Sequence, residues 1–393
     1  MSQGTAVTVT FAGTTLPQAV ATQTGSGPFT AASLEFGNLL HLVVPTGMTK
    51  YSIAYVCADL NDEFVIEATV MDSTALTVSC PGFLGPSDVG LATGRVDAAA
   101  ISGTTNLLVS GSGRGGTLSG TSGPFSVNMP VGSDDIAFVA FGAPSHALGV
   151  KILPSQSIPG LVNEGNTVVL GAGDAIVMQP ATILNVPPGF LFPGVNAQYH
   201  TTHGTVISLV TGIQFNDPNP TTYPAVPAAS VQNGDFYLYS VNTFDNAFPP
   251  SKQIGTSVTT TSGGGPVTIA LPAPWSFAGP TPAAFPTFTF NYSGFSGLPA
   301  ASQQTTLIWP VGPKNRIVLT VTATANFQNG ATTLTIPDLT SLTGFFGPAP
   351  SGAKVSWIAD IMGGTTQEFI FQVNPPPNGS LSFVENRGDY IEP

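Results

Sequence analysis

The sequence has very little charge for its length. Asp, Glu, Lys and Arg make up only 8% of its 393 residues, whereas they make up roughly 25% of an average soluble domain. Nine residues are Lys or Arg, the formal net charge is −12, and no run of basic residues occurs. Because affinity for nucleic acid rests largely on clustered cations that meet phosphates, this deficit argues against a nucleic-acid partner.

Long apolar runs are missing as well. No run approaches the roughly 18 to 20 residues that a membrane helix needs, so we expect no membrane insertion. The first residues, MSQGTAVTVTF, already have the Thr/Val alternation of a strand and lack the regions of a signal peptide. Either the protein stays inside a cell or a virion-producing host, or a leader was removed from a mature form. The composition favours the second, which predicts an extracellular or cell-surface location.

Helical periodicity is almost absent, and alternation with period two recurs along the chain. Val7, Val9 and Phe11 share one face of an expected strand, and the segment 316–327, RIVLTVTATANF, alternates throughout. The best short-helix candidate is 337–346, PDLTSLTGFF, because its proline suits a first helical turn. With 45 Gly and 36 Pro among the short strands, the sequence predicts an all-β protein of tandem antiparallel sandwiches, Ig-like or transthyretin-like, with very little helix.

Several domains are expected in a chain of 40.1 kDa. Proline-rich or polar stretches at 81–90, 151–161 and 271–287 are the candidate boundaries. The prediction is therefore four sandwich units, at 1–88 (with both cysteines), 89–155, 156–272 and 273–393.

One segment, 94–153, has motifs of a known module. A G-x-V strand opens it, a Thr-rich strand leads into G-x-F-S, and a Pro-Val-Gly turn follows; the residues are Gly94, Val96, Gly123, Pro124, Phe125, Ser126, Pro130, Val131 and Gly132. In these motifs the segment resembles the carboxypeptidase-regulatory-like or transthyretin-like β-sandwich of bacterial surface proteins. The resemblance implies a spacer or accessory module and transfers no catalytic residue.

Cysteine is scarce, since Cys57 and Cys80 are the only two. Alternation predicts strands at 51–57, 63–70 and 75–80, joined by short turns as a meander. A bridge requires that the first and third of these strands be neighbours or face each other across a sandwich, because bonded Cα atoms lie within about 7 Å. We predict a disulfide, and two buried reduced thiols are the alternative.

A cation is the one cofactor that the sequence suggests. The segment ADLNDE offers oxygen ligands of the kind that calcium prefers, at Asp59, Asn61, Asp62 and Glu63. It lacks the full D-x-[DN]-x-[DN]-G loop, so an ordinary acidic turn is the favoured interpretation. His200 and His203 form a second, less favoured metal pair, because a spacing of three sends side chains of a strand to opposite faces.

Two tryptophans are candidates for glycan stacking. Trp275 and Trp309 adjoin proline-rich or loop residues, and exposed indole faces stack well on sugar rings. Packing against proline is the alternative.

Catalytic motifs are missing from the sequence. No G-x-S-x-G elbow occurs, and carboxylates are too scarce to indicate an acid pair of the glycosidase type, although two could meet from distant strands. We therefore expect no enzymatic activity.

The function hypothesis is a secreted or cell-surface structural or adhesive protein, bound to other subunits or surface glycans. The nearly uncharged strand 316–327 lacks the lysines that protect exposed edges, so we expect a homo-oligomer, filament or surface layer built by strand addition if that edge is open. Three alternatives stay open: a carbohydrate-binding protein, a hydrolase with a site assembled from distant loops, and a virion structural protein.

Overall fold

Nearly every regular element is a strand, as the sequence predicts. The computed structural model describes residues 4–12, 15–57, 61–80, 89–112, 114–143, 146–210, 222–261, 264–295, 300–312, 315–364 and 378–393. Its helices are short: α1 (Ala325–Gln328) and three 3-10 turns at Ala172–Asp174, Ala228–Ser230 and Tyr292–Phe295. None of the helices in these ranges has the length and apolar character to cross a bilayer.

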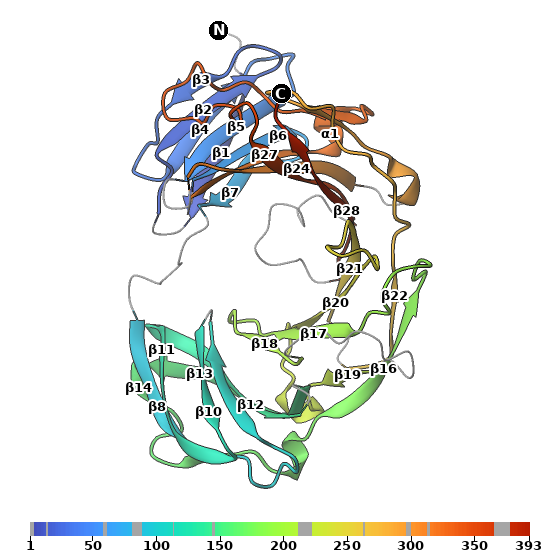
Figure 1. Ribbon diagram of the computed structural model, residues 1–393. Helices are drawn as coiled ribbons and strands as arrows, with labels where there is room; N and C mark the ends of the chain where they lie inside the picture. The colour runs from blue at the N-terminus through green and yellow to red at the C-terminus, as the bar shows by residue number, and fades with distance from the viewer. Residues whose placement is uncertain are drawn as a thin grey trace.

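The largest sheet has 12 strands and includes strands from both ends of the chain (Figure 1). Its strands in spatial order are β18 (Val206–Ser208), β17 (Val195–His200), β20 (Phe236–Phe244), β21 (Lys252–Thr260), β28 (Ser380–Ile391), β27 (Lys354–Gly364), β24 (Ala300–Pro310), β25 (Arg316–Ala323), β6 (Asp62–Thr69), β5 (Lys50–Cys57), β2 (Ala19–Thr24) and β3 (Thr30–Ala32). Neighbours are antiparallel except β25 and β6, which are parallel. The sheet thus joins strands from three of the four predicted units, and the four-unit division itself stays a prediction.

A small second sheet covers the β5–β6 end of the large one. It has the order β4 (Leu39–Val44), β1 (Thr5–Ala12), β7 (Ala75–Ser79). Between the two sheets lies an apolar core that includes Val9, Phe11 and Tyr55, in which the Phe11 and Tyr55 rings meet edge-on at 5.3 Å. This N-terminal sandwich lies at the same end of the molecule as the C-terminus (Figure 1).

The predicted disulfide is confirmed, and it crosses this sandwich. Cys57 ends β5 and Cys80 follows β7, with Cα atoms 5.4 Å apart. The predicted meander is wrong in one respect: β7 does not pair with β6 but crosses to the opposite sheet, where it runs parallel to β1. The bond therefore ties the two layers together.

The segment around 89–170 forms a second two-layer sandwich. One sheet has the order β10 (Arg114–Ser119), β9 (Asn106–Gly111), β12 (Gly132–Gly142), β13 (His146–Ile158). The other has β11 (Ser122–Pro130), β8 (Val89–Asp97) and β14 (Gly160–Leu161), with β15 (Thr167–Val169) also paired to β8. Phe125 and Phe138 meet between the layers with ring centroids 5.3 Å apart.

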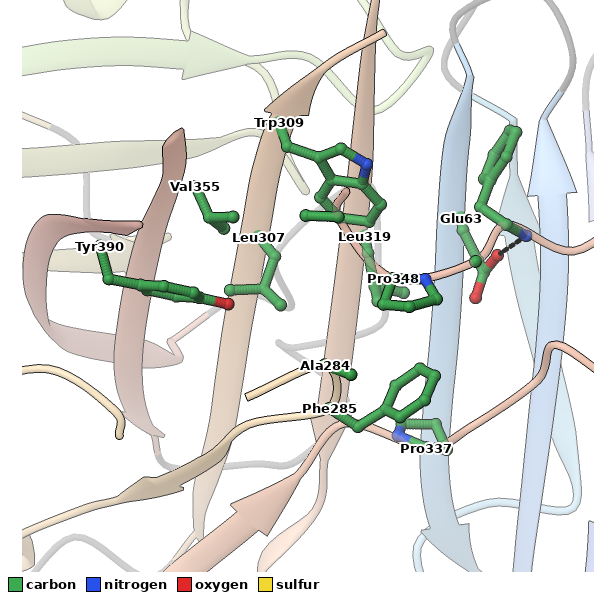
Figure 2. A pocket seen from close by; sticks show the side chains of 13 residues that line it. Glu63, Ala284, Phe285, Leu307, Trp309, Leu319, Pro337, Pro348, Val355 and Tyr390 are labelled. Atoms are coloured by element: carbon green, nitrogen blue, oxygen red, sulfur yellow. Dashed lines mark hydrogen bonds between the residues drawn. The ribbon is translucent and has the colours of Figure 1, made fainter. Parts of the chain in front are cut away.

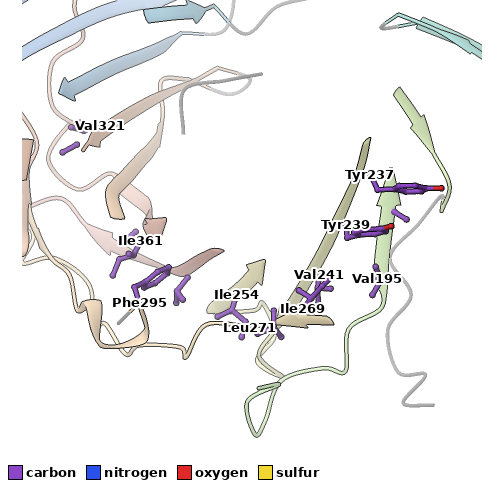
Figure 3. Close-up of a cluster of buried hydrophobic side chains, with 14 of the residues drawn as sticks. Val195, Tyr237, Tyr239, Val241, Ile254, Ile269, Leu271, Phe295, Val321 and Ile361 are labelled. Atoms are coloured by element: carbon purple, nitrogen blue, oxygen red, sulfur yellow. The ribbon is translucent and has the colours of Figure 1, made fainter. Parts of the chain in front are cut away.

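The largest core lies on the other face of the 12-stranded sheet (Figure 3). Small strands help to enclose it: β16 (Val177–Leu184) pairs with β19 (Thr222–Ala225) and β22 (Val267–Ala270), and β23 (Thr287–Thr289) pairs with β26 (Thr333–Thr335). Tyr237 and Tyr239 stack in this core at 5.4 Å. The proline-rich segment 271–287 contributes Leu271 and Trp275 to the same core, so it packs on the sheet rather than linking separate bodies.

Two local predictions are wrong. The strand expected at 316–327 ends at Ala323, because the Thr324 hydroxyl accepts a hydrogen bond from Phe327 N and caps α1. This strand, β25, lies between β24 and β6, so it is not an exposed edge and strand addition there is excluded. The segment 337–346 forms turns rather than a helix, and Gly344 adopts a left-handed φ of 93° that ends any helical run.

We predict that loss of the disulfide destabilises the N-terminal sandwich by about 3 kcal/mol, the chain-entropy value for a loop of this length. Cys57→Ala/Cys80→Ala is compared with the oxidised wild type in urea titrations followed by near-ultraviolet circular dichroism. Reduced wild type is the matched control, and a reductant should leave the double variant unchanged. Equal midpoints for the variant and the oxidised protein would contradict the prediction.

Candidate functional site

A row of polar side chains crosses the central strands of the large sheet. On β27, Trp357 and Ala359 face the core, whereas Asp360 lies on the opposite face. Cross-strand neighbours continue from Asp360 in both directions, and together they make up what we call the polar row: Gln253, Glu385, Asp360, Gln304 and Thr322. Five adjacent strands thus place amide, carboxyl and hydroxyl groups side by side on one face.

Hydrogen bonds link the polar row at both ends. Gln304 Nε2 donates to Thr322 Oγ1 at 2.9 Å. Arg387, which follows Glu385 on the same face of β28, donates through Nη2 to Gln253 Oε1 at 2.9 Å and through Nε to Glu385. Arg387 therefore holds the Glu385 side chain in place. Asp360 lies between its cross-strand neighbours Glu385 and Gln304.

Asp360 is the group in the row with the most altered acidity. Burial, followed by the negative charge of Glu385, raises its pKa well above the ordinary value, and Arg387 acts in the opposite direction. Its Oδ1 is buried and has no hydrogen-bond partner among the described residues. Asp360 therefore keeps a proton at a pH where an ordinary aspartate has lost it, as a general acid must.

Sequence reasoning missed this pair. An aspartate inside a strongly alternating strand, VSWIADI, was the available signal. The partner Glu385 could not be identified, because alternation assigns a residue to a face but does not say which strand lies beside it.

A second buried carboxyl group, Glu63 of β6, lines a small cavity (Figure 2). The cavity has a volume of about 10 Å³ and apolar walls that include Trp309, Phe285 and Pro348, so it has room for about one water molecule. Glu63 is 2% exposed, and its Oε2 accepts a hydrogen bond from Phe346 N at 2.9 Å. Burial raises the pKa of Glu63 to about 7, against the effect of that hydrogen bond. The hydrogen bond from Phe346 N to Glu63 joins the irregular segment 337–349 to the sheet.

The described residues of the candidate calcium loop do not converge. Asp59 lies outside the described residues. Asn61 adopts a left-handed φ of 53° just before β6, and Asp62 and Glu63 are successive residues of that strand, so their side chains point to opposite faces. Within the described ranges, no three His, Cys, Asp or Glu side chains are grouped to hold a metal ion.

The two histidines of YHTTH face different partners. His203 Nδ1 lies 3.0 Å from Asp135 Oδ2. The His200 ring stacks on Phe236 at 4.7 Å, and burial lowers its pKa. A shared metal ion does not fit this arrangement.

Neither candidate tryptophan offers a face for a sugar. Trp275 is 5% exposed and Trp309 is 3% exposed. Trp275 packs against Phe277 and Phe290, and its Nε1 donates to the Asn386 side chain at 3.2 Å when that amide is oriented to satisfy both groups. The candidate role in glycan stacking is therefore wrong, since both indoles are core residues.

Several carboxylates hold loops in place. Asp235 accepts hydrogen bonds from the Tyr199 hydroxyl at 2.5 Å and from Thr202 N at 2.9 Å. Asp134 accepts from both the backbone N and the hydroxyl of Ser112 at 2.8 Å. Each of these acids is buried, at 3% exposed, and each joins segments far apart in the sequence.

Asp72 is another carboxylate that joins distant segments, here the N-terminal sandwich and the start of α1. It accepts hydrogen bonds from Thr69 N at 2.7 Å, from the Thr324 hydroxyl at 2.6 Å and from Asn326 Nδ2 at 2.6 Å. One carboxylate thus fixes its own turn and the distant helix cap.

The comparisons with known proteins give no family. No protein-family model matches the chain, and no curated protein does. Among solved structures, the tip fimbrial protein Mfa3 from Porphyromonas gingivalis with C-terminal truncation is similar over 39% of this chain and 78% of that chain, at 12% identity and a TM-score of 0.19. A likeness of that size supports no inference about fold or function.

We predict that Glu63 makes the protein less stable as the pH rises from about 4.5 to above 7. Its pKa in the folded protein is about 7, against 4.5 ordinarily, so the folded state holds the proton more tightly and the free energy of unfolding falls as that proton is lost. The shift corresponds to about 3 kcal/mol. Glu63→Gln should remove that part of the fall.

The measurement is urea denaturation of wild type and Glu63→Gln at pH 5 and pH 8. Glu164→Gln, which changes an exposed carboxylate, is the matched control and should follow the wild type. Identical pH dependence in wild type and Glu63→Gln would show that the carboxyl group titrates normally.

Proposed function

We propose that this chain is a non-enzymatic structural or adhesive protein of a cell surface or extracellular assembly. Its parts are a continuous sheet, a sandwich module and a covalently fixed N-terminal sandwich. In this role the protein presents surfaces to other protein subunits and needs no cofactor.

The use of the carboxylates is the observation that carries the proposal. Asp72, Asp134 and Asp235 accept hydrogen bonds from backbone and hydroxyl groups of distant segments. Asp72 and Asp235 each accept four hydrogen bonds and Asp134 accepts three. A carboxylate with about four acceptor sites that is used in this way stabilises one conformation and has little acceptor capacity left for a substrate. In a chain with only 21 acidic residues, such use favours scaffolding over catalysis.

The disulfide supports the extracellular location. Bonds of this kind persist mainly in oxidising compartments, and Cys57–Cys80 joins two layers of the fold rather than a surface loop. Proteins are favoured over glycans as partners, since the two indoles that suggested sugar stacking are buried.

A hydrolase is the second candidate, and one observation favours it. Asp360 and Glu385 are opposed on adjacent strands, and Asp360 has a raised pKa, which is a feature of acid–base catalysts. The pair lies on the face of a sheet. Arg387 bonds to Glu385, and Gln304 lies opposite Asp360 on the next strand.

Surface location is tested on intact producing cells that carry the complete gene. Added protease should digest this protein while a cytoplasmic marker stays whole, and maleimide labelling without reductant should find no free thiol. A protected chain with two reactive cysteines would contradict the proposal.

Catalysis is tested with panels of chromogenic glycosides, esters and peptides. We expect no turnover by wild type or by Asp360→Asn. Turnover that is lost in Asp360→Asn but kept in Asp389→Asn, an exposed acid paired with Lys354, would establish the hydrolase instead.

A further inference from the structure

The N-terminal sandwich has an open edge along β4. This strand is the terminal member of the sheet β4–β1–β7, and no described strand pairs with its outer side. Phe11 N donates to Asn38 O at 2.9 Å, which fixes the hydrogen-bonding phase of the antiparallel pair. Every second residue from there bonds to β1, so the backbone groups of His41 and Val43 point outward.

The hydrogen bonds on the other side of β1, toward β7, have the same alternation. Thr8, which is opposite His41 in the register, donates its N–H to Thr74 O and so faces β7 rather than β4. Leu39 also points outward, but Glu35 satisfies both of its backbone groups, at 2.6 and 2.9 Å. Pro45 follows the strand. The open stretch is therefore short and centred on Leu42.

This edge lacks the features that protect other edges of the molecule. Residues 39–44, LLHLVV, include no charged residue and no proline. By contrast, the edge strand β13 carries Lys151, Pro154 and a register shift, and β11 carries Pro124 and Pro130. Lysine, proline and bulges are the usual defences against edge-to-edge pairing.

Exposed apolar side chains flank the open stretch. Phe36 is 91% exposed, Val43 60% and Met48 47%. Phe36 also has a left-handed φ of 49°, a conformation that costs a residue with a Cβ roughly 1 to 2 kcal/mol. At this exposure the Phe36 ring buries little apolar surface in a single copy, whereas a buried aromatic anchor contributes strongly to an interface.

We propose that two copies of this chain pair through their β4 edges, antiparallel and centred on Leu42, to form one continuous sheet. In that register His41 lies opposite Val43 of the second copy, and the outward backbone groups make about four hydrogen bonds. The turn with Phe36 in one copy comes beside the turn with Met48 in the other, because both residues are equally distant from Leu42 in sequence. No like charges meet, so the edge is complementary to itself, as a twofold interface requires.

This inference names a partner for the proposed structural role. The biological purpose of the dimer rests on that role, whereas the existence of the dimer does not. Its test measures the contact itself, so a monomer would leave the surface location unaffected, and a protease-resistant intracellular protein could still dimerise.

Sedimentation velocity of the oxidised full-length chain over a range of concentrations is the experiment. Wild type should show a concentration-dependent monomer–dimer equilibrium. Val43→Lys and Phe36→Asp should each weaken it by about tenfold or more, through charge repulsion across the edge and loss of the apolar anchor. Val43→Thr should keep the dimer, and Val131→Lys, which alters a residue 52% exposed in the turn between β11 and β12, is the matched control.

The register is tested by mixing His41→Cys with Val43→Cys under oxidising conditions. Cross-linking should be faster in the mixture than in either variant alone, and circular dichroism shows that each variant is folded. A wild type that is monomeric at every concentration would overturn the proposal. In that case a strand of another protein would be the candidate partner for the β4 edge. A dimer that Val43→Lys does not weaken would overturn it too.

Discussion

The parallel pairing of β25 with β6 is the contact on which the architecture depends. It runs from Val318 beside Asp62 to Ala323 beside Glu67, and it joins segments that are far apart in the sequence. Closing so long a loop carries a conformational entropy cost that grows only slowly with length, and the buried faces of both strands offset it. Asp72 adds a polar tie at the end of this pairing, where it binds Thr324 and Asn326. The hydrogen bond from Phe346 N to Glu63 and the packing of Ala54 and Val65 in the largest core join the same two parts of the molecule.

Scarcity of charge explains how the ionisable groups are used. Asp235 and Asp134 accept N–H and O–H donors and so fix loops, whereas Glu63 and Asp360 lie where burial raises their pKa. Glu63 accepts one backbone hydrogen bond and Oδ1 of Asp360 has no partner among the described residues, so little opposes the effect of burial on the pKa of either group. Asp360 differs further in having a second carboxylate, Glu385, as its neighbour.

Alternation predicted the strands but not their partners. The expected strands at 51–57, 63–70 and 75–80 match β5, β6 and β7 within about a residue at most ends, which is the accuracy that boundaries allow. The disulfide followed from there being only two cysteines. Period two could not show that β7 leaves its neighbour β6 for β1, nor that β25 is internal, because both depend on long-range pairing.

The missed features share a cause as well. Thr324 ends a strand by capping α1, and Trp275 and Trp309 are buried by segments distant in sequence. The candidate glycan platform and calcium loop, neither of them the favoured interpretation, rested on residue type alone. The polar row depends on which strands lie side by side. Composition and period therefore gave the fold class, and tertiary pairing determined the candidate site.

The position of β28 has a consequence for how the protein is made. This strand, residues 380–391, is inserted between β21 and β27 and is the only member of the described sheet that touches both. A nascent chain leaves the ribosome in sequence order, so β21 emerges long before the strand that will cover it. During that interval its side is exposed to other chains, and the two halves of the sheet cannot meet. The two halves of the sheet can therefore join only after residues 380–391 have been synthesised.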